Sequence, residues 1–167
     1  MIAMSFNGNF MCTSFKIDLL KGKHDFTNGQ DQFKIALFTN SAEPTQGSFG
    51  GSGTEMNASV TNYSNNNQVG ASGDYTTGGG PALANVTPAV ASGSTTTAST
   101  SFATKTWGSA TITARGAILY NTQTAGGSGT SDAVLVLDFG SDKSSSSGDF
   151  TINFPTNNSS SAIIRIA

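Results

Sequence analysis

One cysteine and one histidine, Cys12 and His24, are the residue types that nucleophilic enzymes most often combine. They flank a predicted short helix, and nothing around them matches a cysteine-hydrolase pattern. A zinc site based on one cysteine would need several further ligands. Since a lone cysteine is usually a small core residue, we expect a buried Cys12, a surface His24 and no catalytic pair.

Four aspartates, Asp132, Asp138, Asp142 and Asp149, lie close together in the sequence beside Gly/Ser-rich segments. Carboxylate oxygens in that setting can hold calcium, but the spacing does not fit an EF-hand, and aspartates also cap turns. The Asp-Phe-Gly at 138–140 matches a kinase magnesium motif without the other kinase motifs. We expect turn-capping carboxylates and no cofactor, with a calcium site as the alternative.

Glycoside hydrolysis needs two carboxyl groups facing each other across a sugar cleft. Outside the turn aspartates, the chain offers only Glu43 and Glu55, both within a Gly/Ser-rich segment. This is a poor basis for an acid–base pair. The sequence therefore predicts no catalytic residues and a protein that is not an enzyme.

Four aromatic residues could instead stack on sugars in a binding module. Trp107 and Tyr120 lie within strong strand patterns, which favours a core position for both. Tyr63 and Tyr75 lie in a long polar segment and are the candidate stacking platforms.

Arg115 lies between two apolar strand patterns, where an arginine is often paired with a carboxylate. The acidic segment that carries Asp138 and Asp142 offers partners. We predict a structural ion pair between Arg115 and this segment.

The composition is polar but weakly charged. Of 167 residues, 23 are Ser, 22 Thr, 20 Gly and 14 Asn, against 8 basic and 10 acidic residues. Eleven Phe can supply a core, while the shortage of Glu and Arg argues against a helical bundle. A net charge of −2 and the absence of Lys/Arg runs argue against nucleic acid as a partner. No apolar run is long enough to span a membrane, and the N-terminal residues do not resemble a signal peptide, so we expect synthesis in a cytoplasm.

The pattern along the chain predicts a single all-β domain, an antiparallel β-sandwich of Ig-like or jelly-roll-like type with one short helix. Residues 1–13 are expected to form an extended arm, followed by the sandwich at 14–167. The helix is expected to begin at an N-cap, Ser14, and to place Phe15 and Leu19 on one face.

Strands are predicted from apolar alternation and turn signals. They are expected at 32–39, at 82–90 with Pro88 at an edge, at 110–113 and 116–121 with a bulge between them, at 133–139, at 150–154 and at 162–166. Residues 144–148 are expected to form a turn. Long loops rich in Gly, Ser, Thr and Asn are expected at 39–80 and 91–105.

Several blocks of the sequence resemble small structural virion proteins of tailed bacteriophages. They are Phe15-Lys16-x-Asp18-x-Leu20-x-Gly22-x-His24-x-Phe26, Phe33-Lys34-Ile35-Ala36-Leu37-Phe38, Tyr75-Thr76-x-Gly78-Gly79, Trp107, Thr111-Ile112-Thr113-Ala114-Arg115-Gly116-Ala117, Tyr120-Asn121, Leu137-Asp138-Phe139-Gly140-Ser141-Asp142-Lys143 and Gly148-x-Phe150-Thr151-Ile152. The resemblance covers roughly residues 15–166. It implies a head decoration, head fibre or tail-associated protein and no catalytic residues.

The leading functional expectation is a capsid decoration, or cement, protein on the outer surface of the head. Its partners would be the major capsid protein and copies of itself, with a homotrimer favoured at a three-fold position. Phe6, Phe10 and Met11 of the arm are the candidate assembly contacts. The alternatives are a tail or fibre module that recognises a host-surface glycan through its loops, and a neck or tail adaptor.

Overall fold

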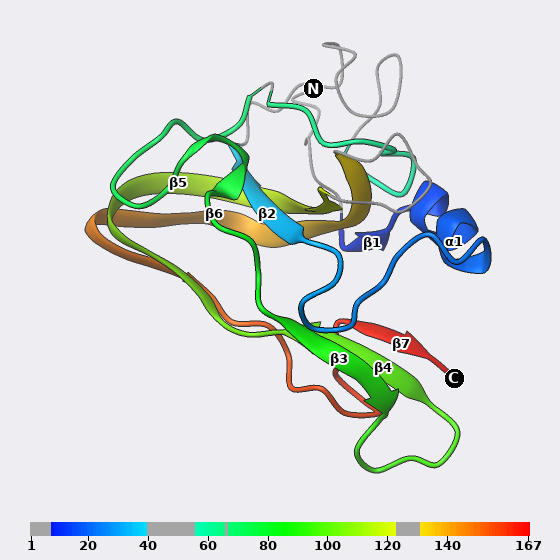
Figure 1. Ribbon diagram of the computed structural model, residues 1–167. Coiled ribbons are helices and arrows are strands. Elements are labelled where there is room, and N and C mark those ends of the chain that lie inside the picture. Colours follow the sequence, from blue (N-terminus) through cyan, green and yellow to red (C-terminus); the bar gives the residue numbers. More distant parts are fainter. Residues whose placement is uncertain (1–7, 40–55, 66, 123–130) are drawn as a thin grey trace.

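The computed structural model describes residues 8–39, 56–65, 67–122 and 131–167. Their strands form two antiparallel sheets, as expected for an all-β sandwich-like single domain (Figure 1). The first sheet has the order β1-β6-β5-β2 and the second the order β3-β4-β7. The elements are β1 (Phe10–Met11), α1 (Thr13–Leu20), β2 (Phe33–Phe38), a 3-10 turn η2 (Thr77–Gly79), β3 (Asn85–Val90), β4 (Ala98–Phe102), β5 (Lys105–Asn121), β6 (Asp132–Ile152) and β7 (Ile164–Ile166).

The strand order differs from that of an immunoglobulin domain. Constant-type immunoglobulin sheets pair their strands as ABED and CFG, which in chain order is 1-2-5-4 and 3-6-7. Here the two orders are 1-6-5-2 and 3-4-7. The likeness to that fold therefore lies in the two-sheet architecture and not in the connectivity.

The four-stranded sheet is built on the most apolar segments of the chain. In β2 every residue except Lys34 is buried, and the strand pairs with β5 from Phe33 opposite Asn121 to Phe38 opposite Gly116. The apolar run predicted as a strand at 133–139 lies within β6; residues 133–136 are all buried, whereas residues 137–139 are only partly buried. Strands β1 and β5 flank that run on its two sides.

Strands β5 and β6 form one long ribbon instead of the several short strands predicted. Ala114 pairs with Lys143 while Gly116 pairs with Asp138, so residues 139–142 of β6 lie opposite Arg115 alone. This confirms the bulge expected at Arg115–Gly116 but joins the strands on either side of it into β5. The predicted turn at 144–148 is wrong, because these residues continue β6 through a region of register shifts opposite β5.

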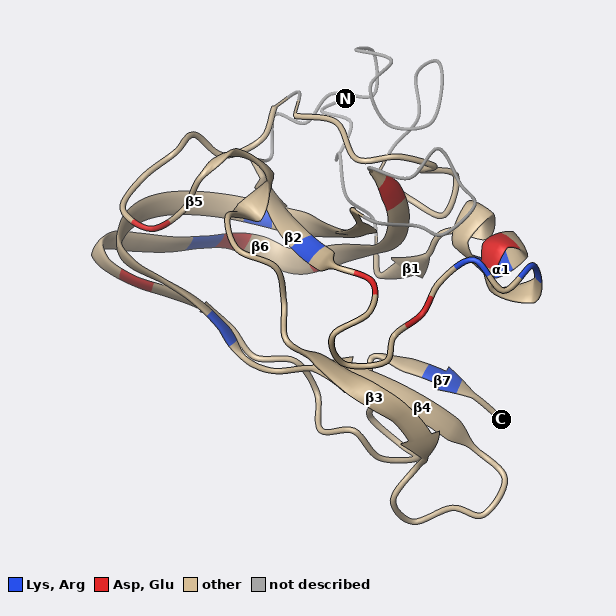
Figure 2. Ribbon diagram, in the orientation of Figure 1, with Lys and Arg blue, Asp and Glu red and all other residues tan. Residues whose placement is uncertain are grey.

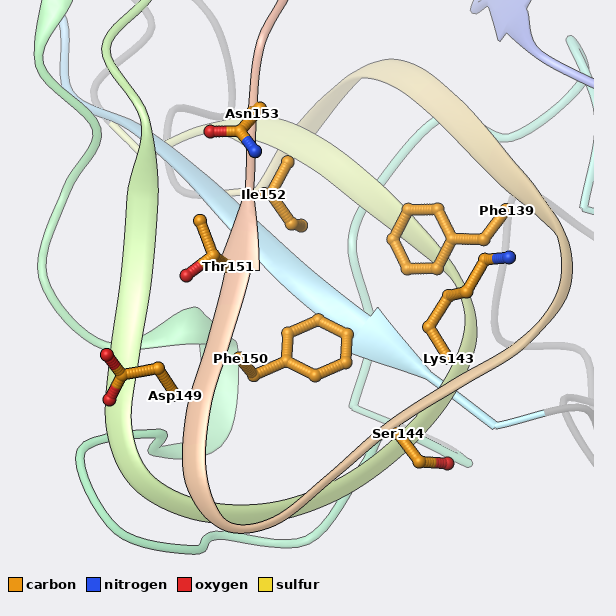
Figure 3. Close-up of a pocket in the computed structure, with 8 residues that line it drawn as sticks. All are labelled: Phe139, Lys143, Ser144, Asp149, Phe150, Thr151, Ile152 and Asn153. Atoms are coloured by element: carbon orange, nitrogen blue, oxygen red, sulfur yellow. The ribbon is translucent and has the colours of Figure 1, made fainter.

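The ribbon bends sharply where Ser109 and Ser147 adopt positive φ angles of 51° and 48°. Figure 3 shows the bend as a U-shaped turn of both strands. Register shifts lie next to the bend in β5, between Trp107 and Ala110 and between Ala110 and Ile112. Bulges of this kind increase local twist and bend a strand, so the Ser/Gly-rich sequence at 144–148 turns the ribbon without ending it.

The three-stranded sheet uses much smaller side chains. Strand β3 lies at an edge and changes register between Val86 and Ala89, where Pro88 cannot donate a ladder hydrogen bond, as predicted. The predicted loop at 91–105 is confirmed at 91–97 and 103–104, which lie outside the strands, but it is wrong at 98–102 and at Lys105. Its Ser/Thr-rich residues form β4, which pairs with both β3 and β7, and Lys105 already belongs to β5.

Helix α1 begins two residues earlier than expected, with Cys12 instead of Ser14 as N-cap. Ser14 lies inside the helix, and its hydroxyl approaches the carbonyl of Val60 at 3.5 Å. Phe15 is buried and Leu19 is partly buried against the core, as the spacing predicts. None of the helices in the described residues has the length and apolar character needed to cross a membrane.

Aromatic rings join the two sheets. Phe26 stacks on Phe33 of β2, with centroids 4.3 Å apart, and both rings contact Phe102 of β4. Phe102 also contacts Phe154, at 5.3 Å. One apolar core therefore spans both sheets.

Candidate functional site

A surface recess lies on the inner side of the ribbon bend, between two parts of β6 (Figure 3). We call this site the β6 recess. Its volume is about 470 Å³, and it is lined by Phe139, Lys143, Ser144 and residues 149–152 of β6, together with Asn153, which follows the strand. Phe139 and Lys143 line one side, and Phe150 and Ile152 line the other. The local sequence explains the site, since the bend at Ser147 brings these segments face to face.

The floor of the β6 recess is apolar. Phe150 is buried, and its ring centroid lies 6.2 Å from that of Trp107. Phe139 and Ile152 are partly buried against the same core. In Figure 3 the rings of Phe139 and Phe150 both point into the space between the two parts of β6. An apolar side chain or the apolar face of a sugar ring would find contact surface there.

The polar groups of the β6 recess are largely engaged by the fold itself. The Lys143 ammonium donates to the hydroxyl of Ser141 at 3.0 Å. The hydroxyls of Ser144 and Thr151 each bond to a threonine hydroxyl of β5, at 2.9 and 3.0 Å. The Asp149 carboxylate points away from the two rings (Figure 3). The recess is therefore suited to binding, and its residues do not form an acid–base pair.

The predicted ion pair forms between Arg115 and Asp138, and both side chains are largely buried. Nη1 of Arg115 contacts Oδ1 of Asp138, and Nη2 lies 3.5 Å from Oδ2. Oδ1 also accepts the Gly140 amide at 2.7 Å. Asp142, the other predicted partner, is exposed and forms no ion pair with Arg115. The pair fastens the β6 bulge onto β5.

Two of the three arm residues pair with the chain's own sheet. Phe10 lies opposite Val136 and Met11 opposite Leu135, both in β6, and both arm side chains pack partly against the core. The side chain of Asn9 accepts the Asp138 amide at 2.7 Å. Residues 10–11 of the expected extended arm thus form an edge strand of the four-stranded sheet. Phe6 lies outside the described residues, and the role of all three in assembly stays a prediction.

Tyr63 and Tyr75 are not the open stacking platforms expected. Tyr75 is fully buried, and its hydroxyl accepts the Leu37 amide at 2.8 Å and an amide hydrogen of Gln68 at 2.8 Å. Tyr63 lies flat against Tyr120, with centroids 4.3 Å apart, and also bonds to Gln68. Burial raises the pKa of Tyr75 to about 12. These rings fasten residues 56–80 to the four-stranded sheet.

Glycines complete this tyrosine cluster. Tyr120 donates to the Gly78 carbonyl at 2.8 Å, and Trp107, buried like Tyr120 as predicted, donates to the Gly79 carbonyl at 2.9 Å. Gly79 has φ +91°, and a Cβ there would collide with the Ile35 carbonyl. The sequence analysis did not predict that these glycines pack against β2 and the aromatic rings, although the run Gly78-Gly79-Gly80 indicates a backbone that needs positive φ or close contact.

The remaining candidate groups do not come together. The four aspartates are spread along β6, with Asp138 in its ion pair and Asp142 and Asp149 exposed. No group of three or more metal-binding side chains occurs within the described residues. Glu43 and Glu55 lie outside the described residues.

Cys12 is buried as predicted, and burial raises the pKa of its thiol to about 12. His24 was expected at the surface, but its ring packs against Phe15 at 4.9 Å and is half-buried. The Asn121 amide lies 3.0 Å from Nδ1 of His24, and burial lowers the pKa of the imidazole. A thiol and an imidazole held in these states lack the features of a nucleophile and its base.

Comparison with known proteins gives no match: no family model, no curated protein and no solved structure resembles the chain significantly.

Proposed function

We propose that the protein is a structural virion component of a tailed bacteriophage, and more specifically a capsid decoration protein that binds and reinforces the assembled head. The sequence blocks at 15–26, 33–38 and 111–117 support the virion assignment through their resemblance to such proteins. The observation that carries the binding role is the β6 recess, an open site with an apolar floor.

The β6 recess would act as the docking site for an apolar side chain of the shell. Phe139 and Ile152 keep part of their surface exposed, so a partner side chain would cover apolar area at the cost of few polar groups. The ribbon beneath them is held by the Arg115–Asp138 pair and by the core, so little ordering entropy is lost on binding. Weak contacts of this kind suffice when many copies bind one shell.

The arm prediction needs a refined test. Removing residues 1–13 would delete β1 and the N-cap Cys12, so loss of binding would report on folding as well as on docking. A single change, Phe6→Ser, leaves every described contact in place. Reduced binding of this variant to particles would support the arm as an assembly contact, and full binding would count against it.

The experiment for this proposal locates the protein in purified particles of the phage that encodes it. Quantitative gel densitometry and cryo-electron microscopy would give its copy number and position. Many copies spread over the head support decoration. A small number matching the ring symmetry of the neck or tail would instead identify an adaptor, and absence from the particle would refute a virion role.

Recognition of a host-surface glycan is the second candidate, and one observation favours it. The β6 recess exposes part of the Phe139 ring beside Lys143, an arrangement that can stack on a sugar. A glycan array with the purified protein and the variant Phe139→Ala distinguishes the two functions. Decoration predicts no signal above background, whereas a glycan module predicts a signal that the variant loses.

A further inference from the structure

Helix α1 presents an outward face that covers nothing in the described structure. The exposed residues Lys16, Ile17 and Leu20 of the helix and the C-cap Lys21 follow a spacing that places them on one side of it. Leu20 is 92% exposed and Ile17 48% exposed. Apolar side chains of this size flanked by lysines are unusual on a surface that faces only water.

An apolar groove runs beside this helix. It lies between the end of α1 with residues 24–26 and the three-stranded sheet, and its volume is about 230 Å³. The apolar lining consists of Leu19, Phe26, Pro88, Ala98, Ile164 and Ile166. Asp25 lies at its mouth with an exposed carboxylate. We call this site the α1–β7 groove, and Figure 1 shows the two elements that bound it.

The sheet extends the groove as an apolar row. Val90 pairs with Ala98, and Ala98 pairs with Ile166, so the three side chains lie on one face across β3, β4 and β7. Val90 is 66% and Ile166 61% exposed. Of the five large apolar residues exposed in the described chain, four therefore belong to the helix face or to this row. Strands β3 and β4 contain no charged residue, and Arg165 is the charged residue of β7 (Figure 2).

We propose that this surface is the interface with a second copy of the chain, related by a two-fold axis. Leu19, the residue before the projecting Leu20, lines the α1–β7 groove, so the last turn of α1 supplies both the projection and part of the groove wall. A two-fold contact uses the same patch on both subunits, and each copy would then place Leu20 into the partner's groove.

The charges of the patch also complement each other across a two-fold axis. The helix face carries Lys16 and Lys21, and the groove carries Asp25. Within the described residues, these three form no ion pair, in contrast to Lys23 and Asp18, which pair at 3.2 Å. In the proposed dimer the lysines of one copy approach Asp25 of the other. The pairing is independent of the shell-binding proposal and differs from the homotrimer expected at a three-fold position.

Sedimentation equilibrium of the purified full-length chain over a wide concentration range tests the interface. We expect a dimer for the unmodified protein. The variant Leu20→Glu places a charge in the apolar contact and should raise the dissociation constant by about 30-fold or more. Val86→Glu is the matched control. Val86 is paired with Ser101, and Ser101 lies on the face of β4 opposite to Thr100, which lines the groove. Val86 itself is outside the groove. It should leave the dimer intact.

Charge reversal gives a second, independent readout. Lys16→Glu with Lys21→Glu, or Asp25→Lys alone, should weaken the dimer, and combining all three changes in one chain should restore it. A monomer at every concentration, a stoichiometry other than two, or a dimer that Leu20→Glu leaves unchanged would overturn the proposal. Circular dichroism melting of each variant confirms that the fold is retained. None of these outcomes depends on where the protein lies in a virion.

Discussion

The tyrosine cluster on the four-stranded sheet and the α1–β7 patch on the three-stranded sheet use their side chains in opposite ways. In the cluster, Tyr75 and Trp107 are buried and their polar atoms bond to the backbone of Leu37 and Gly79. In the patch, Leu20 and Ile166 remain exposed. In the first region the aromatic residues stabilise the fold by packing in its interior, whereas in the second region apolar surface remains available to a partner. Substitutions should therefore act on stability in the first region and on association in the second.

The largest expected loss of stability follows Gly79→Ala. A Cβ at this position meets the Ile35 carbonyl, and φ is +91°. We expect a loss of about 4 kcal/mol, measured by urea denaturation, because the backbone of β2 cannot retreat. Gly29→Ala is the control: φ is similarly positive, at +89°, but nothing lies within 4 Å. It should cost only about 1 kcal/mol, and equal effects of the two variants would refute the packing explanation.

Arg115→Met should rank next. It leaves the Asp138 carboxylate largely buried without its cation, which we expect to cost about 3 kcal/mol, the lower end of the range for breaking a buried pair. Adding Asp138→Asn removes the unpaired charge and should recover part of the loss in the same denaturation experiment. Arg165→Met, which changes an exposed arginine, provides the baseline. If Arg115→Met had the same free energy of unfolding as Arg165→Met, the ion pair would have no structural role.

A moderate effect is expected from alkaline pH. The folded-state pKa of Cys12 is raised from 9.0 to about 12 and that of Tyr75 from 10.0 to about 12, so the folded protein holds these protons more tightly than the unfolded chain. Their contribution to stability is therefore full below pH 9 and falls as the pH rises toward 12. Denaturation curves across this range should show the decline. Cys12→Ala should delay its onset to about pH 10, the ordinary range of tyrosine, and an unchanged onset would contradict the assignment.

The smallest effect on unfolding is expected from Leu20→Ser in the α1–β7 patch. Because Leu20 is almost wholly exposed, the melting temperature of the dilute monomer should change by less than about 2 °C. The same substitution should weaken association measured at high concentration. A large destabilisation of the monomer would show that Leu20 belongs to the fold, and the contrast between the two regions would disappear.

The apolar elements could be predicted from sequence because local pattern determines them. The alternation in 33–38, the apolar run at 133–136 and the interruption at Pro88 each indicate one structure. The Arg115 ion pair was also predictable, since an arginine inside an apolar strand needs a counter-charge. The choice between Asp138 and Asp142 was not, because it depends on the register of the β6 bulge.

Other features depend on contacts between distant segments. Residues 98–102 are nearly all Ser, Thr or Ala and have no apolar alternation, yet they form the central strand of their sheet because β3 and β7 pair with them on both sides. Residues 144–148 read as a turn but bend a strand. The β6 recess arises from that bend, so no local pattern could reveal it.

The central claim is that this domain docks on the phage head through the β6 recess. The most direct measurement adds purified protein to particles that lack it and determines the bound copy number and the contact surface by cryo-electron microscopy. We predict saturable binding over the head with Phe139 and Ile152 facing the shell, and loss of binding by Phe139→Glu under conditions where its melting curve shows that the variant is folded. Full binding by that variant, or a map in which the β6 recess faces away from the shell, would contradict the account.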